Sequence, residues 1–121
     1  MIPKFRAWNT FHNKWVKHFY ITENGLIYNM EQPHMDLIGA VPIEQSGLVV
    51  MQSTGLFDKN GKEIFEGDVV RILDEKLSKI YYSDGAFCVD ILNGGTPLHA
   101  FLSEHLEVIG NIYENPELME G

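Results

Sequence analysis

Residues 51–72, MQSTGLFDKNGKEIFEGDVVRI, place dense turn chemistry between short apolar segments. The sequence DKNG at 58–61 predicts a tight turn, because Asn60 tolerates the left-handed backbone region and Gly61 prefers it. A second turn is predicted at 66–68, EGD, just before the next apolar segment opens. Three strands separated by two tight turns are typical of an antiparallel β architecture.

Turn residues in this stretch and beyond it are expected to set backbone geometry rather than to carry chemistry. Asp84-Gly85 is the strongest two-residue hairpin signal of the chain, and it predicts a hairpin between strands at 78–83 and 86–92. The residues that we assign to structural turns are Gly55, Asn60, Gly61, Gly67, Asp84 and Gly85.

Residues 2–20 fit two structures. One histidine and several aromatic residues recur at the spacing of one helical face: Phe5, Trp8, His12, Trp15 and Phe19. The alternative is a β-hairpin with strands near 4–8 and 14–21. Aromatic enrichment favours strands, and the asparagines between them suit a turn, so we expect the hairpin.

The segment at 29–46 is interrupted by two prolines, which remove backbone donors and restrict the residues before them. It follows a turn at Asn24-Gly25 and a strand expected at 26–28. Residues 35–40 fit either a short strand or one helical turn. We interpret 29–46 as a variable loop and as the seam between two subdomains.

Further strands are expected at 48–52 and 107–113, and the sequence NGGTP at 93–97 predicts a turn leading into 98–102. Asn115-Pro116 supplies a helix N-cap followed by a proline suited to a first helical position, so a short C-terminal helix is predicted. Short strands spaced about ten residues apart predict a mainly β fold, a small antiparallel barrel or sandwich.

The net charge of −8 lies entirely in residues 51–121, which carry 5 basic and 13 acidic side chains. This acidic half disfavours general affinity for nucleic-acid phosphates. The single cysteine, Cys88, excludes an internal disulfide framework, and no apolar run approaches the roughly 18 residues of a membrane span. With no N-terminal signal pattern, we expect a cytoplasmic protein.

Metal sites and cofactor sites are not predicted. A calcium-binding loop starting at Asp58 needs glycine at its sixth position and glutamate at its twelfth, where this chain has Glu63 and Val69. Gly94-Gly95 lacks the lysine and the helix start that a phosphate loop requires. The five histidines, at 12, 18, 34, 99 and 105, show no metal-binding spacing.

No catalytic residues are predicted either. Cys88 or Ser53 combines on paper with a histidine and an aspartate, but a chain of this length always offers such sets. Cys88 alternates within an apolar strand, so we expect a buried structural cysteine.

The N-terminal segment is the one candidate for binding. Its aromatic residues alternate with cations, a pattern that grips single-stranded nucleic acids and that also suits protein interfaces. Packing of Phe5, Trp8, Trp15 and Phe19 as the core face of the hairpin is the competing interpretation, and we rank it first. The candidate binding residues are Arg6, Trp8, Trp15, Lys17 and Tyr20.

Three blocks of the chain resemble the YopX family of small phage- and prophage-encoded proteins of Gram-positive bacteria. They are KFRAW at 4–8, MQSTGLFDKNGKEIFEGDVV at 51–70 and EVIGNIYENPEL at 107–118. The resemblance implies one YopX-like domain over 1–121 in a bacterial host cell, with an aromatic β subdomain at 1–47 and an SH3-like barrel at 48–121. It implies no catalytic set. Ser53 departs from the pattern, since a larger, often aromatic residue is expected there.

Together these features predict a non-enzymatic β module that binds a protein partner or assembles as a homo-oligomer. The alternative is a nucleic-acid-associated protein that uses the N-terminal hairpin.

Overall fold

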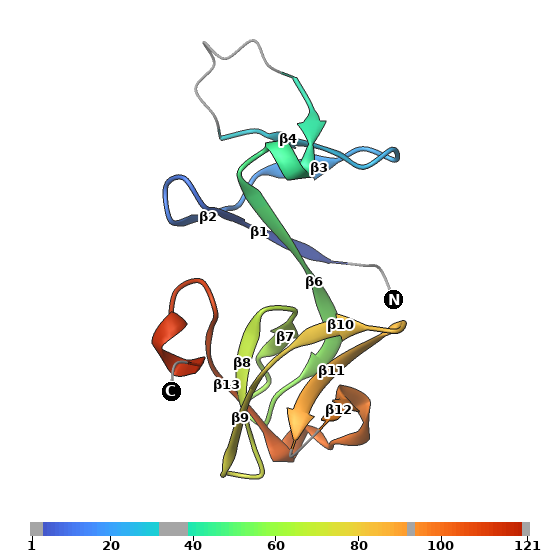
Figure 1. Cartoon of the computed structure of the whole chain (residues 1–121), viewed down its shortest axis with the longest axis vertical. Coiled ribbons are helices and arrows are strands. Elements are labelled where there is room, and N and C mark those ends of the chain that lie inside the picture. The colour runs from blue at the N-terminus through green and yellow to red at the C-terminus, as the bar shows by residue number, and fades with distance from the viewer. Residues whose placement is uncertain (1–3, 32–38, 92–93, 120–121) are drawn as a thin grey trace. The chain divides into compact units, whose positions relative to one another are not determined.

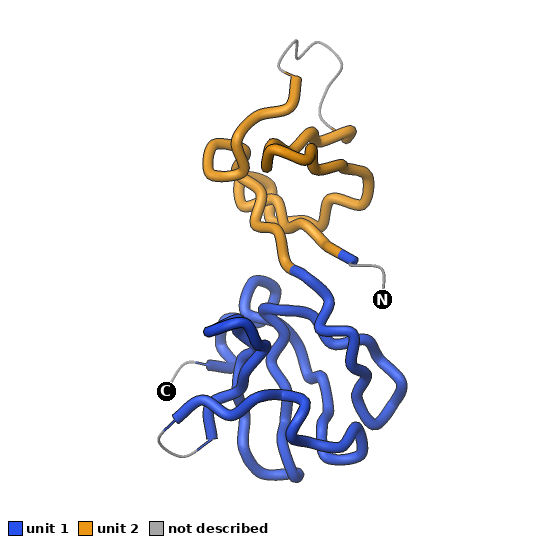
Figure 2. The backbone as a smooth tube through the Cα atoms, turned by 90° about the vertical axis from the view of Figure 1, so that its right-hand side faces the viewer, with its two compact units in different colours: residues 1–4, 52–121 blue, residues 5–51 orange. Residues whose placement is uncertain are grey.

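The structure, a computed structural model, describes residues 4–31, 39–91 and 94–119 (Figure 1). Its elements are short β-strands and single turns of 3₁₀ helix, which confirms the mainly β fold. Within the described residues, no helix has the length and apolar character needed to cross a membrane. The chain divides into two compact units (Figure 2): residues 5–51, here the N-terminal unit, and Lys4 with the residues from Gln52 onward, here the C-terminal unit.

The N-terminal unit begins with the predicted hairpin, but the strand expected at 14–21 ends at Val16, and a strand of another sheet follows at 19–21. β1 (Phe5–Asn9) pairs antiparallel with β2 (Lys14–Val16), and Trp8 lies opposite Trp15. A separate sheet has the order β3-β4-β5 and consists of β3 (Phe19–Ile21), β4 (Leu26–Asn29) and β5 (Val41–Pro42). The buried core of this unit is small and contains Ala7, Val16, Ile27 and Leu48.

The loop predicted at 29–46 is structured where it is described. It contains β5 and the 3₁₀ turn η1 (Ile43–Gln45), which leads into β6 (Leu48–Phe57). Of the segment 35–40, residues 35–38 lie outside the described residues.

β6 runs to Phe57 and so joins the strand expected at 48–52 to the strand expected before the turn at 58–61. Its register with β7 (Glu63–Phe65) shifts between Ser53 and Phe57, and Gly55 lies inside this shift with φ +77°. Glycine takes this backbone region without the clash that a side chain would bring, so Gly55 permits the bulge that keeps β6 continuous.

The two turns predicted in residues 51–72 are confirmed. Gly61 has φ +79° after β6, and Gly67 has φ +87° between β7 and β8 (Asp68–Ile72). Asn60 lies in the first turn as predicted, and Gly61 is the residue of this turn that takes the left-handed region. The carboxylate of Asp58 fixes the turn before Gly61, since it accepts a hydrogen bond from the Asn60 N–H.

The C-terminal unit adds two three-stranded sheets, β13-β8-β9 and β10-β11-β12, which curve into a half-barrel. Its remaining elements are β9 (Lys76–Lys79), β10 (Tyr81–Ser83), β11 (Ala86–Ile91), β12 (Gly94–Pro97), η2 (Leu98–Ala100), η3 (Ser103–His105), β13 (Leu106–Asn111) and η4 (Pro116–Met119). Seven almost fully buried aliphatic residues form its core: Ile64, Val70, Ile72, Ile80, Val89, Leu98 and Leu106.

Two predictions in this unit need correction. The strand expected at 78–83 is divided at Ile80, whose N–H donates to Asp68 O at 2.8 Å, so β9 and β10 belong to different sheets. The turn expected at 93–97 is wrong for 94–97, because β12 pairs with β11 over this range. Gly95 makes the pairing possible, since a Cβ there would lie 2.5 Å from the Tyr81 hydroxyl.

The hairpin at Asp84-Gly85 and the C-terminal helix are confirmed. Asp84 and Gly85 have φ +50° and +83° between β10 and β11. The helix is the 3₁₀ turn η4, and the Asn115 side chain does not cap it but accepts a hydrogen bond from the Asn111 N–H at 3.2 Å. Asn115 therefore ties the turn back to β13.

Candidate functional site

The predicted binding residues on the first hairpin pack against one another. The rings of Trp8 and Trp15 meet edge to face, with centroids 5.0 Å apart and planes at 77°. Arg6 Cζ lies 4.6 Å from the Trp15 ring centroid, within the range of a cation–π interaction. Trp8 is only 6% exposed, so packing rather than ligand contact accounts for it. Phe5, in contrast, is 45% exposed and does not join a core face.

The other two predicted binding residues lie elsewhere in the N-terminal unit. Tyr20 is half exposed and stacks on Tyr28 across the β3–β4 hairpin, with ring centroids 5.3 Å apart. Lys17 lies in the corner between β2 and β3, where its N–H and that of His18 donate to Glu31 Oε2 at 2.5 and 2.8 Å. The His18 N–H is the main reason why the pKa of Glu31 lies below its ordinary value. The five residues therefore do not form one surface.

Both carboxylate oxygens of Asp58, in the C-terminal unit, accept hydrogen bonds from backbone N–H groups. Its Oδ1 accepts hydrogen bonds from the N–H groups of Asn60 and Lys62 at 2.9 and 2.8 Å, and its Oδ2 accepts one from the Val108 N–H at 2.9 Å. Burial alone would raise the pKa of Asp58, but the three N–H donors, Val108 foremost, outweigh it and the pKa lies below its ordinary value. This carboxylate joins the turn after β6 to β13.

The hydrogen bonds of Ser53 account for its difference from the larger residue expected at this position. Its side chain is buried, its hydroxyl donates to Glu63 Oε2 at 2.5 Å, and its oxygen accepts a hydrogen bond from the Gly55 N–H at 3.0 Å. The other Glu63 oxygen lies 3.5 Å from Lys4 Nζ. The small hydroxyl side chain accepts the hydrogen bond of the Gly55 N–H at the bulge of β6, which a phenylalanine or tryptophan side chain would not do.

Reactive groups are dispersed in the part of the chain that the structure describes. Cys88 is buried on β11, and within residues 4–31, 39–91 and 94–119 no three His, Cys, Asp or Glu side chains converge as metal ligands. The Tyr81 hydroxyl donates to Asp90 Oδ1 at 2.6 Å, and this bond raises the pKa of Tyr81 to about 12. Tyr81 is therefore held protonated and is poorly suited to act as a base.

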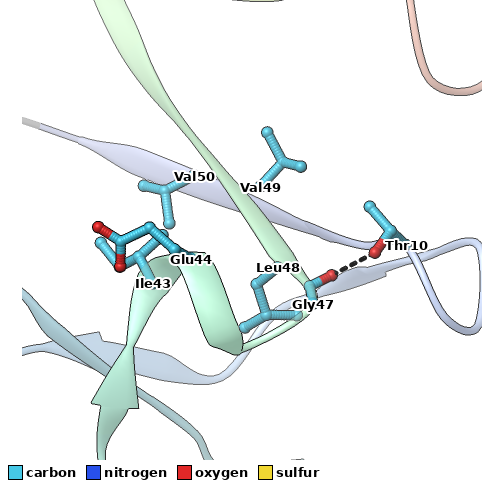
Figure 3. A pocket seen from close by; sticks show the side chains of 7 residues that line it. All are labelled: Thr10, Ile43, Glu44, Gly47, Leu48, Val49 and Val50. Atoms are coloured by element: carbon cyan, nitrogen blue, oxygen red, sulfur yellow. Dashed lines mark hydrogen bonds between the residues drawn. The ribbon is translucent and has the colours of Figure 1, made fainter.

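The N-terminal unit holds an open pocket of about 530 Å³ that the sequence did not predict. Three segments of the N-terminal unit line it: Thr10 after β1, Ile43 and Glu44 of η1, and Gly47 with the first residues of β6, Leu48, Val49 and Val50. Figure 3 shows Ile43, Glu44 and Val50 on one side of β6, and Thr10 and Val49 on the other. Its wall is aliphatic except for Thr10 and the exposed Glu44.

The end of the first hairpin holds one side of this pocket in place. Both the Thr10 N–H and the Thr10 hydroxyl donate to Gly47 O, at 2.9 and 2.7 Å. The Phe11 ring lies so close over Gly47 that a Cβ at this position would overlap it, although Phe11 itself is 74% exposed. An exposed aromatic side chain thus stands beside an aliphatic pocket. The only sequence signal was the interpretation of 29–46 as a variable loop, which contributes Ile43 and Glu44.

Comparison with known proteins assigns the chain to a family. The model of the YopX protein family matches residues 4–120. The chain belongs to the YopX family. No curated protein matches it.

Two crystal structures of similar proteins extend the comparison. Protein EF1440 from Enterococcus faecalis is 33% identical, with 99% of each chain covered and a TM-score of 0.70. Protein yopX from Bacillus subtilis is 24% identical over 97% of this chain and 95% of its own, with a TM-score of 0.63, a likeness that shows the fold alone. Membership of the family indicates the fold. The role of the pocket is argued below from the residues that line it.

Proposed function

We propose that this YopX protein is a non-catalytic binding module whose partner is a protein and whose binding site is the pocket of the N-terminal unit. One observation carries the proposal: an open aliphatic pocket adjoins the exposed aromatic ring of Phe11. Aromatic anchors beside apolar pockets are typical of the centres of protein interfaces. The phage or prophage setting implied by the family suggests that the partner belongs to the phage or to its host.

A protein ligand is favoured over nucleic acid by what the pocket offers. Single-stranded nucleic acids need cations along the backbone and free aromatic faces for the bases. The polar side chains of this pocket are a threonine and a carboxylate, and Trp8 and Trp15, the strongest stacking candidates, pack against each other.

Site-specific photo-crosslinking tests the proposal directly. A photoreactive amino acid replaces Val49 in the pocket or, as a control, Leu77, a partly exposed aliphatic residue on β9 of the C-terminal unit. In phage-infected host cells, we expect the Val49 position to crosslink one defined protein, identified by mass spectrometry, and the Leu77 position not to do so. Equal crosslinking at both positions, or crosslinking at Leu77 alone, would place the interface elsewhere.

A charge introduced into the pocket provides a second arm of the same experiment. Val49→Arg adds a cation to the aliphatic wall, and Leu77→Arg adds the same group to the control surface. With the photoreactive residue at Thr10, Val49→Arg is expected to abolish the crosslink and Leu77→Arg to leave it. Loss in both variants would indicate an effect of net charge and would contradict the assignment of the pocket.

A further inference from the structure

Beside the pocket, one edge of β6 is paired with no strand of the described residues. The Thr10 N–H donates to Gly47 O at 2.9 Å and the Ser53 N–H donates to Lys4 O at 2.7 Å, so β1 and β6 run antiparallel and both bonds fit the same register. Hydrogen-bonded residues alternate in such a pair. Odd-numbered residues of β6 from Gly47 to Ser53 therefore direct their N–H and C=O groups toward β1, and the even-numbered residues direct theirs to the opposite edge.

Leu48 and Val50 are the even-numbered residues next to the pocket. The Leu48 N–H is satisfied by Ser46 Oγ at 3.0 Å. Farther along this edge, Gln52 O accepts a hydrogen bond from the Glu66 N–H at 2.9 Å, and β7 pairs with β6 from Ser53 onward. Among the residues that the structure describes, no strand pairs with the edge between these points. Within the described ranges, Leu48 C=O and both backbone groups of Val50 have no strand partner there.

An open edge of this kind accepts one type of ligand well, an extended chain that adds as a further strand. Alternate side chains of such a strand point to the same face. One of them would enter the space between η1 and β6, which Ile43, Leu48 and Val50 line with aliphatic groups. A branched aliphatic side chain matches that wall, and three backbone hydrogen bonds to Leu48 and Val50 fix its position.

Glu44 supplies the second element of recognition. Its carboxylate is exposed on η1 at the pocket, and it makes no ion pair with any described residue. A lysine or arginine next to the aliphatic residue of the ligand would complement it. A second copy of this chain fits less well, because it would bring another net charge of −8 and another Glu44 to the same edge.

We infer that the pocket binds an extended segment of a partner protein, added in β conformation along Leu48 and Val50, with a branched aliphatic side chain in the pocket and an adjacent lysine or arginine at Glu44. This inference rests on the proposed function and specifies the ligand of the same site. It requires no change of the fold, since the edge and the pocket are already formed.

Selection from a random ten-residue peptide library against the full chain tests this specificity. We expect enriched peptides to carry a branched aliphatic residue beside lysine or arginine, and selection on Glu44→Lys to enrich aspartate or glutamate instead. For a single enriched peptide, Glu44→Lys should weaken binding about threefold to fivefold, as is typical of one exposed charge pair. Enrichment without this reversal, or no enrichment relative to a Val50→Arg variant, which places a cation in the space between η1 and β6, would overturn the inference.

Amide hydrogen exchange separates this inference from the proposed function. The selected peptide should slow exchange of the Val50 N–H, and a version with a central proline, which lacks one backbone donor, should bind more weakly. Slower exchange at Val50 with rising protein concentration alone would identify a second copy as the occupant and overturn the inference. If no peptide slows exchange of the Val50 N–H while the crosslink at position 49 persists, the proposal of a protein partner is retained. The inference that the partner binds as an added strand is then wrong.

Discussion

The two units of this protein differ in the size of their buried cores. In the C-terminal unit, seven aliphatic residues form the core. Asp58 accepts hydrogen bonds from backbone N–H groups, and the Ser53 hydroxyl donates to Glu63. The N-terminal unit has four buried core residues, an open strand edge and an aliphatic pocket. The proposed binding site therefore lies in the unit with the smaller core.

The same substitution in both cores gives the largest expected contrast. Ile64 is fully buried in the C-terminal core and Ile27 is 1% exposed in the N-terminal core. Ile64→Ala should lower the free energy of unfolding by about 4 kcal/mol and Ile27→Ala by about 2 kcal/mol, because a small core collapses more easily around a cavity. Chemical denaturation measures both, with Leu102→Ala, at an exposed position, as the control. A larger loss for Ile27→Ala would reverse the comparison.

Removing the charge of Asp58 tests the polar bracing of the C-terminal unit. Asp58→Asn turns an N–H donor toward the Val108 N–H or leaves that group unpaired, so a loss of about 2 kcal/mol is expected at pH 7. The pKa of Asp58 is lower in the folded state than its ordinary value of 3.8. Its stabilising effect is therefore fully present above that value and lost as the pH falls through the folded-state pKa.

The stability difference between wild type and Asp58→Asn should accordingly be constant near neutral pH and decrease below about pH 4. Urea denaturation over a pH series measures it. Asp74→Asn, at a side chain that is 90% exposed, is the control and should change little. A difference that grows as the pH falls would contradict the assigned sign.

Gly61 tests the turn that most constrains the fold. A Cβ at this position meets no atom within 4 Å, so Gly61→Val is opposed by its φ of +79° alone. A loss of about 1–2 kcal/mol is expected from this backbone region. Gly94→Val is the matched control, because Gly94 is also surrounded by open space and has no positive φ. Equal melting temperatures for Gly61→Val and wild type would refute the turn assignment.

The smallest effect is expected at the aromatic pair of the N-terminal unit. Tyr20→Ala removes the ring that stacks on Tyr28 and should cost less than about 1 kcal/mol, as cross-strand pairs do. Tyr20→Phe keeps the ring and should be close to neutral. If Tyr20→Ala costs as much as Ile64→Ala, the solvent face of the β3–β4 hairpin is structural and the division between the units is less sharp.

Local chemistry explains which elements were predictable from the sequence. Tight turns such as Asp84-Gly85 depend on two residues whose backbone preferences are strong, so their positions were correct. β12 was missed because Gly94 and Gly95 read as a turn, whereas their pairing with β11 depends on the space that Gly95 leaves for Tyr81. Such contacts between distant residues leave no local pattern.

The proposed pocket shares no residue with the binding residues expected from the sequence. Aromatic and basic residues such as Trp8 attract attention in a sequence, but Trp8 is buried against Trp15. The pocket instead is lined by ordinary aliphatic residues from three segments, and its open edge follows from the register between β1 and β6. The local sequence predicts neither which segments come together in the fold nor the direction in which a backbone N–H or C=O group points.

Hydrogen exchange at two neighbouring amides tests the central claim without any partner. The Val49 N–H points to β1, and the Val50 N–H points to the open edge beside the pocket. In the free protein, the Val50 amide is expected to exchange about tenfold or more faster than the Val49 amide, because an unpaired N–H needs no opening of the sheet. Equal protection of both amides would show that this edge is already paired and would contradict the account of residues 5–51 as the recognition unit.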